Sequence, residues 1–269
     1  MSKFFHIIKV LKGLNWKWVY HFYGKRLNMY GFYFWSKLRG QTYFEISIDG
    51  ANLKLGFNTP YHHLFARSLE QKKHEPVTLS MFKKAAETVE SGKAIFDFGG
   101  YNGVYGLLGA TVNPLAKVLI VEPDPVNAKQ IQANIDLSGL KNVQVIQAAV
   151  GEKSGAVKFA FHSGATAGKI TANVTTEVKS LTLADCVREI GSIPALIKFD
   201  VVGAEQDALL AASELLKKTD NLDILLELYP RPEIEKKQLT GMFKELGFKM
   251  IFLYPRSDGG SVYYWVFKK

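Results

Sequence analysis

Two acidic residues stand where apolar strands are expected to end. Asp97 lies in the apolar segment 94–98, which leads directly into the glycine-rich turn 99–103. Glu122 follows a second apolar run, 118–121, and comes 25 residues after Asp97. In open α/β sheets ligands bind beyond the carboxyl ends of the strands, and glycines let the backbone approach a ligand closely. We therefore expect the turn and both carboxylates to contact one bound ligand.

The spacing within the turn indicates which ligand this is. A dinucleotide-binding turn reads Gly-x-Gly-x-x-Gly and holds a pyrophosphate at a helix N-terminus. Here the pattern from Asp97 to Gly103 is Asp-x-Gly-x-x-x-Gly, and a carboxylate at the strand end repels phosphate. S-Adenosylmethionine has no phosphate, carries a sulfonium and an ammonium group, and presents two ribose hydroxyls to an acceptor such as Glu122. The acids therefore favour S-adenosylmethionine as the cofactor.

The elements that would position these residues alternate between apolar runs and amphipathic stretches. Strands are expected at 94–98, 118–121, 143–148, 196–199, 224–228, 250–253 and 262–267, with helices at 126–137, 206–217 and 234–246. Such alternation predicts an α/β fold with a doubly wound, mostly parallel sheet covered on both faces. The last two strands have no helix between them and should pair as a hairpin. An antiparallel final strand is typical of Rossmann-like methyltransferase sheets.

A separate region precedes this sheet. Alternating residues flank Asp49-Gly50, a dipeptide favoured in type I′ turns, so we expect a β-hairpin with strands at 43–48 and 52–57. Residues 58–92 are expected to form loop and helix, ending near Ser91-Gly92. The predicted organisation is a basic aromatic N-terminal helical segment (1–40), a β-hairpin and helical lead-in (41–92) and a cofactor-binding domain (93–269).

The first 40 residues carry most of the excess charge. The chain has a formal net charge of +9, and this segment holds eight Lys or Arg and no acid. Twelve aromatic residues are interleaved with the cations, and Phe4, Ile7, Ile8 and Leu11 share one helical face. A helix on an anionic membrane surface has this pattern. A helical cap packed on the main domain explains the pattern as well and is favoured over membrane contact for these aromatics. Stacking on nucleic acid is the least favoured of the three.

Several further motifs resemble, in order, those of FkbM-type methyltransferases, over roughly residues 94–250. They are Asp97–Gly103, Glu122–Pro125, Ala148–Gly151, Ile197–Glu205 and Leu225–Pro230. The resemblance implies an O-methyltransferase that acts on hydroxyls of sugars, glycans or related metabolites, often in bacterial surface-glycan pathways. From the turn, the two acids and this resemblance together, the predicted cofactor residues are Asp97, Gly99, Gly100, Tyr101, Asn102, Gly103, Glu122, Pro123, Ala148 and Asp200.

The chain departs from the family pattern at three positions. The usual Asp-Val-Glu-Gly reads Asp200-Val201-Val202-Gly203, and the usual Glu-x-His reads Glu227-Leu228-Tyr229. The usual Asn of the glycine turn is replaced by Tyr101, unless Asn102 takes its place through a shifted turn. These departures motivate one alternative, a binding protein that keeps the cofactor fold without turnover. The basic N-terminus motivates another, an RNA methyltransferase.

Methyl transfer to an alcohol needs an aligned acceptor and a group that takes its proton. Asp200 is the first candidate base, and Glu227, Tyr229 and His162 are further catalytic candidates. Lys198 lies inside an apolar strand, where an unpaired charge is costly, so we expect an ion pair with Glu227.

The composition also sets limits. The single cysteine, Cys186, excludes an intramolecular disulfide, and the adjacent His62 and His63 make a poor metal site, although they are candidate acceptor contacts. We expect no structural metal. The sequence shows neither a signal peptide nor an apolar run long enough to span a membrane, which predicts a cytoplasmic protein, peripheral to the inner membrane surface if residues 1–40 bind lipid.

Overall fold

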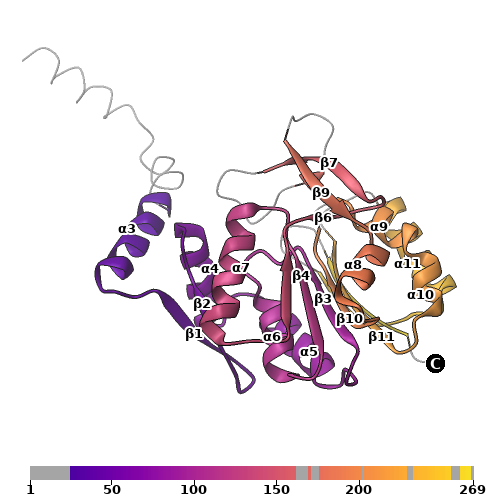
Figure 1. Ribbon diagram of the computed structural model, residues 1–269, viewed down its shortest axis with the longest axis horizontal. Coiled ribbons are helices and arrows are strands. Elements are labelled where there is room, and N and C mark those ends of the chain that lie inside the picture. The colour runs from indigo at the N-terminus through magenta and orange to yellow at the C-terminus, as the bar shows by residue number, and fades with distance from the viewer. Residues whose placement is uncertain are drawn as a thin grey trace, which may run out of the picture.

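A seven-stranded sheet forms the centre of the molecule (Figure 1). The computed structural model describes residues 25–161, 169–170, 176–201, 203–228, 233–255 and 261–267. The strands lie in the order β12 (Lys249–Pro255), β13 (Ser261–Phe267), β11 (Leu222–Leu228), β10 (Pro194–Phe199), β3 (Ala94–Phe98), β4 (Lys117–Val121) and β5 (Val143–Ile146). Neighbours from β11 to β5 are parallel, and β13 is antiparallel to both β11 and β12. The predicted mostly parallel sheet with an antiparallel final strand is confirmed.

Helices cover both faces of this sheet, as expected for buried parallel strands. The helices of one face are α5 (Pro76–Glu87), α6 (Val104–Val112) and α7 (Pro125–Ser138), and those of the other are α8 (Leu183–Ile190), α9 (Glu205–Ala211), α10 (Ser213–Lys218) and α11 (Glu233–Glu245). Alternate strand residues feed two apolar clusters, with Ile95 packed on the first face and Phe96 on the second. The helix expected over 206–217 is divided in two at Ala212.

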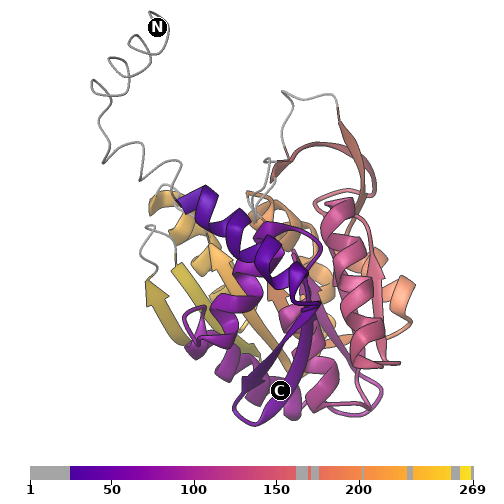
Figure 2. The same ribbon diagram turned by 90° about the vertical axis from the view of Figure 1, so that its left-hand side faces the viewer.

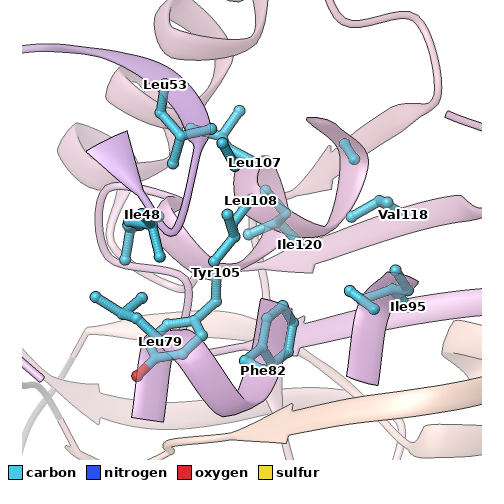
Figure 3. Packing of buried hydrophobic residues seen from close by; sticks show 14 of the residues in the cluster. Ile48, Leu53, Leu79, Phe82, Ile95, Tyr105, Leu107, Leu108, Val118 and Ile120 are labelled. Carbon is cyan, nitrogen blue, oxygen red and sulfur yellow. The ribbon is translucent and has the colours of Figure 1, made fainter. Parts of the chain in front are cut away.

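The β-hairpin packs outside α6 and α7. Strands β1 (Tyr43–Ile48) and β2 (Ala51–Gly56) meet at Asp49 and Gly50, whose φ values of 45° and 86° suit a type I′ turn. Figure 3 shows Ile48 and Leu53 of the hairpin beside Leu107 and Leu108 of α6. The first strand lies where it was predicted, and the second is shifted by one residue. The region 58–92 holds α4 (Pro60–Glu70) and α5, joined by a short linker.

A small second sheet was not predicted. It contains β6 (Ala149–Val150), β9 (Glu177–Leu181), β7 (Gly155–Ala160) and β8 (Lys169–Ile170) in that order. The apolar run 143–148, expected to be one strand, ends as β5 at Ile146, and the chain then leaves the large sheet as β6. Two of the four strands have only two residues each, and in β7 only Phe159 is buried, so the period-2 pattern that marks a half-buried strand is weak here.

Helix α3 (Lys25–Leu38) is the outermost helix, on the side of α4 away from the large sheet (Figure 1). Figure 2 looks at the molecule from this side and places α3 and the β1–β2 hairpin towards the viewer. The Tyr33 hydroxyl donates to the Asn58 carbonyl at 3.0 Å, and Ser36 Oγ lies 2.9 Å from His63 Nε2. The helical face predicted at Phe4–Leu11 lies outside the described residues. Within the described ranges, no helix is long and apolar enough to cross a bilayer.

Candidate functional site

Glycines bring the turn after β3 against the residue that follows β10. Gly99 and Gly103 have φ values of 79° and 85°, in the left-handed region that favours glycine. A Cβ atom on Gly99 would lie 1.8 Å from the backbone oxygen of Asp200, and one on Gly100 would lie 2.3 Å from the Ile120 side chain. The turn and Asp200, predicted from separate motifs, are therefore in direct contact.

The carboxyl group of Asp97 is buried beneath this turn. Its Oδ2 accepts a hydrogen bond from the backbone nitrogen of Gly106, in α6, at 2.8 Å. Its Oδ1 has no hydrogen-bond partner among the residues that the structure describes. Burial raises the pKa of Asp97 to about 6, although the charge of Lys198 and the Gly106 bond act to lower it. A buried polar atom without a partner is uncommon in folded proteins, so Oδ1 is a candidate ligand contact.

Glu122 ties the end of β4 to the glycine turn. Its Oε2 accepts from the backbone nitrogen of Tyr101 at 2.9 Å, and its Oε1 accepts from the Asp124 nitrogen at 2.9 Å and from Asn127 Nδ2 at 3.3 Å. Burial raises the pKa of Glu122 to about 7, and these hydrogen bonds only partly oppose the shift. The backbone nitrogen of Ala148 donates to the Glu122 carbonyl at 3.2 Å, and Pro123 is half-buried beside it. The predicted acid thus lies within one hydrogen bond of the turn.

The two residues between the glycines have different surroundings. Tyr101 adopts a φ of 51°, and its ring packs edge-on against His62 and Phe65, with centroids 5.3 and 5.0 Å away. Asn102 is fully buried, and its Oδ1 accepts from the Val104 nitrogen at 3.3 Å. Neither the Tyr101 hydroxyl nor Asn102 Nδ2 has a hydrogen-bond partner in the described part of the chain. Both groups are therefore candidate ligand contacts.

Lys198 is a buried cation at the centre of the acids. Its Nζ lies 2.9 Å from Asp200 Oδ2 and 3.4 Å from Glu227 Oε1, which confirms the predicted pair with Glu227 and adds one with Asp200. Burial alone would lower the pKa of Lys198, but four carboxylates outweigh it and raise the pKa well above its usual value; they belong to Asp200, Glu227, Asp97 and Glu75. Lys198 therefore stays charged and holds two of the catalytic candidates in place.

The two adjacent histidines have structural partners. His62 Nε2 lies 2.9 Å from Asn127 Oδ1, and its Nδ1 lies 2.5 Å from Asn58 Oδ1. Both His62 and His63 are at most 2% exposed, and burial lowers the pKa of each. Their expected role as acceptor contacts is therefore wrong. His62 instead supports Asn127, which donates to Glu122.

Sequence reasoning missed a second wall of the site, at the start of α5. Tyr105, on α6, donates from its hydroxyl to Glu75 Oε2 at 2.7 Å, and Lys198 Nζ lies 4.8 Å from the centre of the Tyr105 ring. His74 Nε2 lies 3.2 Å from Glu75 Oε1. Pro76 after Glu75 signals a helix start, but no local pattern reveals that the Glu75 carboxylate turns towards β10.

Some predicted positions lie outside the described residues: Tyr229, His162 and Val202. The remaining candidates surround the carboxyl ends of β3, β4, β10 and β11. Among the described residues, no three His, Cys, Asp or Glu side chains are grouped so as to hold a metal ion.

Comparison with known proteins identifies the family to which this chain is similar. The family model described as Methyltransferase FkbM domain matches residues 97–250. A comparison with curated protein sequences finds no match. Similar solved structures include a precorrin-6y C5,15-methyltransferase from Geobacter metallireducens, with 9% identity over 73% of this chain and 89% of that one and a TM-score of 0.47. Fibrillarin from Aeropyrum pernix, with bound S-adenosyl-L-methionine, has 12% identity over 69% of this chain and 73% of that one, with a TM-score of 0.45. TYW2 from M. jannaschii, in complex with AdoMet, has 14% identity over 84% of this chain and 85% of that one, with a TM-score of 0.42.

Proposed function

Because this chain belongs to the FkbM methyltransferase family and is an S-adenosylmethionine-dependent methyltransferase, we propose that it methylates a hydroxyl oxygen of a sugar, glycan or related metabolite. The observation that carries the proposal is Asp200, whose backbone lies against Gly99 of the glycine turn. One oxygen of its carboxylate is held by Lys198, and the other has no hydrogen-bond partner among the described residues. A fixed carboxylate oxygen at this position suits an acceptor O–H group.

The residues present fit the cofactor. Two polar atoms around the turn have no hydrogen-bond partner in the described chain: Asp97 Oδ1 and Asn102 Nδ2. The glycines of the turn have no side chain that would keep a ligand from the backbone. In this proposal Glu122 accepts the ribose hydroxyls, and the turn from Gly99 to Gly103 lies along the nucleoside. Pro123 and Ala148 border the site through Glu122. The bound cofactor supplies an electrophilic methyl group on a sulfonium.

Asp200 is then the group that receives the acceptor proton. As the new O–CH₃ bond forms, the acceptor O–H bond breaks and its proton passes to Asp200 Oδ1, while the electron pair of the old C–S bond stays on sulfur. Lys198 keeps Asp200 in one orientation, so proximity and alignment supply much of the rate. Glu227 holds Lys198 from the other side and is a positioning residue in this scheme.

Asp200→Asn should lower methyl transfer by roughly 10²- to 10⁴-fold, as expected for loss of a general base, while cofactor affinity changes by less than about threefold. The assay follows radiolabelled methyl transfer to a panel of methyl glycosides and sugar nucleotides, with cofactor affinity measured by calorimetry. Asp136→Asn, an exposed acid on α7, is the matched control and should behave as wild type. Label transferred to amines or RNA but not to any hydroxyl would contradict the proposal.

We further propose that the N-terminal region docks the enzyme on an anionic membrane surface. Tyr30, Phe34 and Leu38 of α3 recur every four residues and are 52, 64 and 70% exposed, whereas Met29 and Ser36 on the opposite face are buried. Arg39 stacks on Trp35, next to this apolar face, with 3.3 Å between guanidinium and ring centre. No acid occurs before Glu45 in the sequence. An outward apolar face with flanking cations suits the interface of an anionic bilayer.

The double variant Phe34→Ala/Leu38→Ala should bind vesicles of 30% phosphatidylglycerol in phosphatidylcholine roughly tenfold or more weakly than wild type, because two large apolar side chains are lost from the interface. Co-sedimentation at 0.15 M salt measures the affinity. Leu115→Ala removes an equally exposed side chain (69%) from another part of the surface and should change nothing. Equal binding to pure phosphatidylcholine would contradict the preference for an anionic membrane. Displacement of the vesicles by an RNA oligonucleotide would count against a lipid-docking surface.

A further inference from the structure

Glu75 has an unusual backbone and an unusual side-chain direction. It occupies the N-cap position of α5 with a φ of 44°, in the left-handed region that side chains other than glycine rarely adopt. Acids at this position commonly accept hydrogen bonds from the first helical N–H groups, but the Glu75 side chain forms no capping bond within the described chain. A conformation of this kind persists only when other contacts fix it, and such residues cluster at functional sites.

The contacts that fix Glu75 direct its carboxylate into the site. Oε2 accepts the Tyr105 hydroxyl at 2.7 Å, and Oε1 lies 3.2 Å from His74 Nε2. The Tyr105 hydroxyl also lies 3.0 Å from Thr78 Oγ1, so the tyrosine is held by α5 as well. Burial would raise the pKa of Glu75, but His74, the Lys198 charge and the Tyr105 bond lower it to about 2. The side chain is therefore a carboxylate at neutral pH.

The surroundings hold more negative than positive charge. Asp97 and Lys198 are paired in register on adjacent strands, and Asp200 and Glu227 contact the same lysine. With Glu75, four carboxyl groups act on a single buried ammonium group. This side of the glycine turn, at β3 and β10, therefore suits a ligand with positive charge. The other side, at Glu122, offers hydrogen-bond acceptors to an uncharged group.

We propose that Glu75 binds the α-ammonium group of the methionine half of S-adenosylmethionine, an assignment that rests on the cofactor site described under the proposed function. The nucleoside half is uncharged and matches the Glu122 side, whereas the sulfonium and the ammonium are both in the methionine half and match the acid-rich side. A carboxylate and an ammonium group form a charge-assisted hydrogen bond. Tyr105 and the strained backbone hold the carboxylate ready for it.

Three ligands separate this role from a structural one. S-Adenosylmethionine has both the sulfonium and the ammonium, S-adenosylhomocysteine keeps the ammonium alone, and 5′-methylthioadenosine has neither. Glu75→Gln keeps the shape and an oxygen for Tyr105 while removing the charge. It should weaken binding of the first two ligands by roughly ten- to a hundredfold and change binding of 5′-methylthioadenosine by less than about twofold, as measured by calorimetry.

The control variants make each result decisive. Glu70→Gln, an exposed acid at the end of α4, should affect none of the ligands, and Glu122→Gln should weaken all three, because they share the nucleoside. Tyr105→Phe removes the hydrogen bond that holds the Glu75 carboxylate. It should weaken binding of S-adenosylmethionine and S-adenosylhomocysteine by about threefold or more and leave binding of 5′-methylthioadenosine unchanged. If Glu75→Gln loses affinity only for S-adenosylmethionine, Glu75 acts on the sulfonium and the proposal is overturned. An equal loss of affinity for all three ligands, or no loss for any of them, would also overturn it. Wild-type protein that binds none of them would refute the cofactor site itself, and this inference with it.

Discussion

Replacing Lys198 by methionine should lower the free energy of unfolding by about 3–5 kcal/mol, the range expected when one partner of a buried ion pair is removed. Lys198 is 3% exposed and lies within 3.4 Å of both Asp200 and Glu227. Methionine fills a similar volume, so the cost comes from the buried carboxylates that lose their cation and not from a cavity. Urea denaturation should show a lower midpoint with an unchanged slope.

Two further variants test the cause. Lys198→Met/Asp200→Asn removes the nearest negative charge as well, and it should recover at least about 1 kcal/mol relative to Lys198→Met, because the two effects are coupled. Lys83→Met breaks a pair at the protein surface, where Glu87 is 44% exposed, and should cost less than about 1 kcal/mol. A Lys198→Met protein as stable as wild type would mean that the cluster is held by packing and not by charge.

The sequence predicted that the glycine turn and Glu122 lie together because its signals are local. The strand, the glycine turn and Glu122 lie on consecutive elements of one parallel sheet, and the carboxyl ends of parallel strands meet at one edge. The pairing of Lys198 with Glu227 followed from a charge placed in an apolar strand. Its second pair, with Asp200, joins residues two apart in the sequence, which the period of a strand places on the same face; only the partner on the next strand was predicted from the sequence.

The opposite wall could not be predicted in the same way. The Glu75 carboxylate lies where it feels the charge of Lys198 because α5 packs on α6 and the backbone adopts a positive φ. Neither condition leaves a periodic signal in the sequence. His62 and His63 illustrate the reverse error: adjacent histidines suggested binding chemistry, whereas tertiary packing uses them to join α3, α4 and α7. The two-residue strands β6 and β8 are too short to produce a pattern.

Raising the pH from 5 to 8 should lower the free energy of unfolding of the cofactor-free protein by about 4 kcal/mol through Glu122 and Asp97. Their pKa values rise from 4.5 to about 7 and from 3.8 to about 6, chiefly through burial. Well below their unfolded pKa values of 3.8 and 4.5 both groups are protonated in the folded and unfolded states, so the free energy of unfolding no longer changes with pH through them. Above these values the unfolded chain loses its protons first, and each pH unit until the folded group ionises costs about 1.4 kcal/mol. Stability from this source is therefore highest at low pH and lost as pH rises to 7.

Glu122→Gln isolates the larger contribution. The amide cannot ionise, so about 3 kcal/mol of the loss between pH 5 and 8 should disappear, whatever constant offset its altered hydrogen bonds with Tyr101 and Asp124 introduce. Wild-type affinity for S-adenosylmethionine should rise roughly tenfold from pH 6 to 8, because the ribose hydroxyls donate to the ionised carboxylate, and this rise should be absent in Glu122→Gln. Parallel stability curves for the two proteins would show that Glu122 is ionised throughout. The acid that destabilises the empty site above pH 6 is, on this account, the one whose ionised form the bound cofactor stabilises.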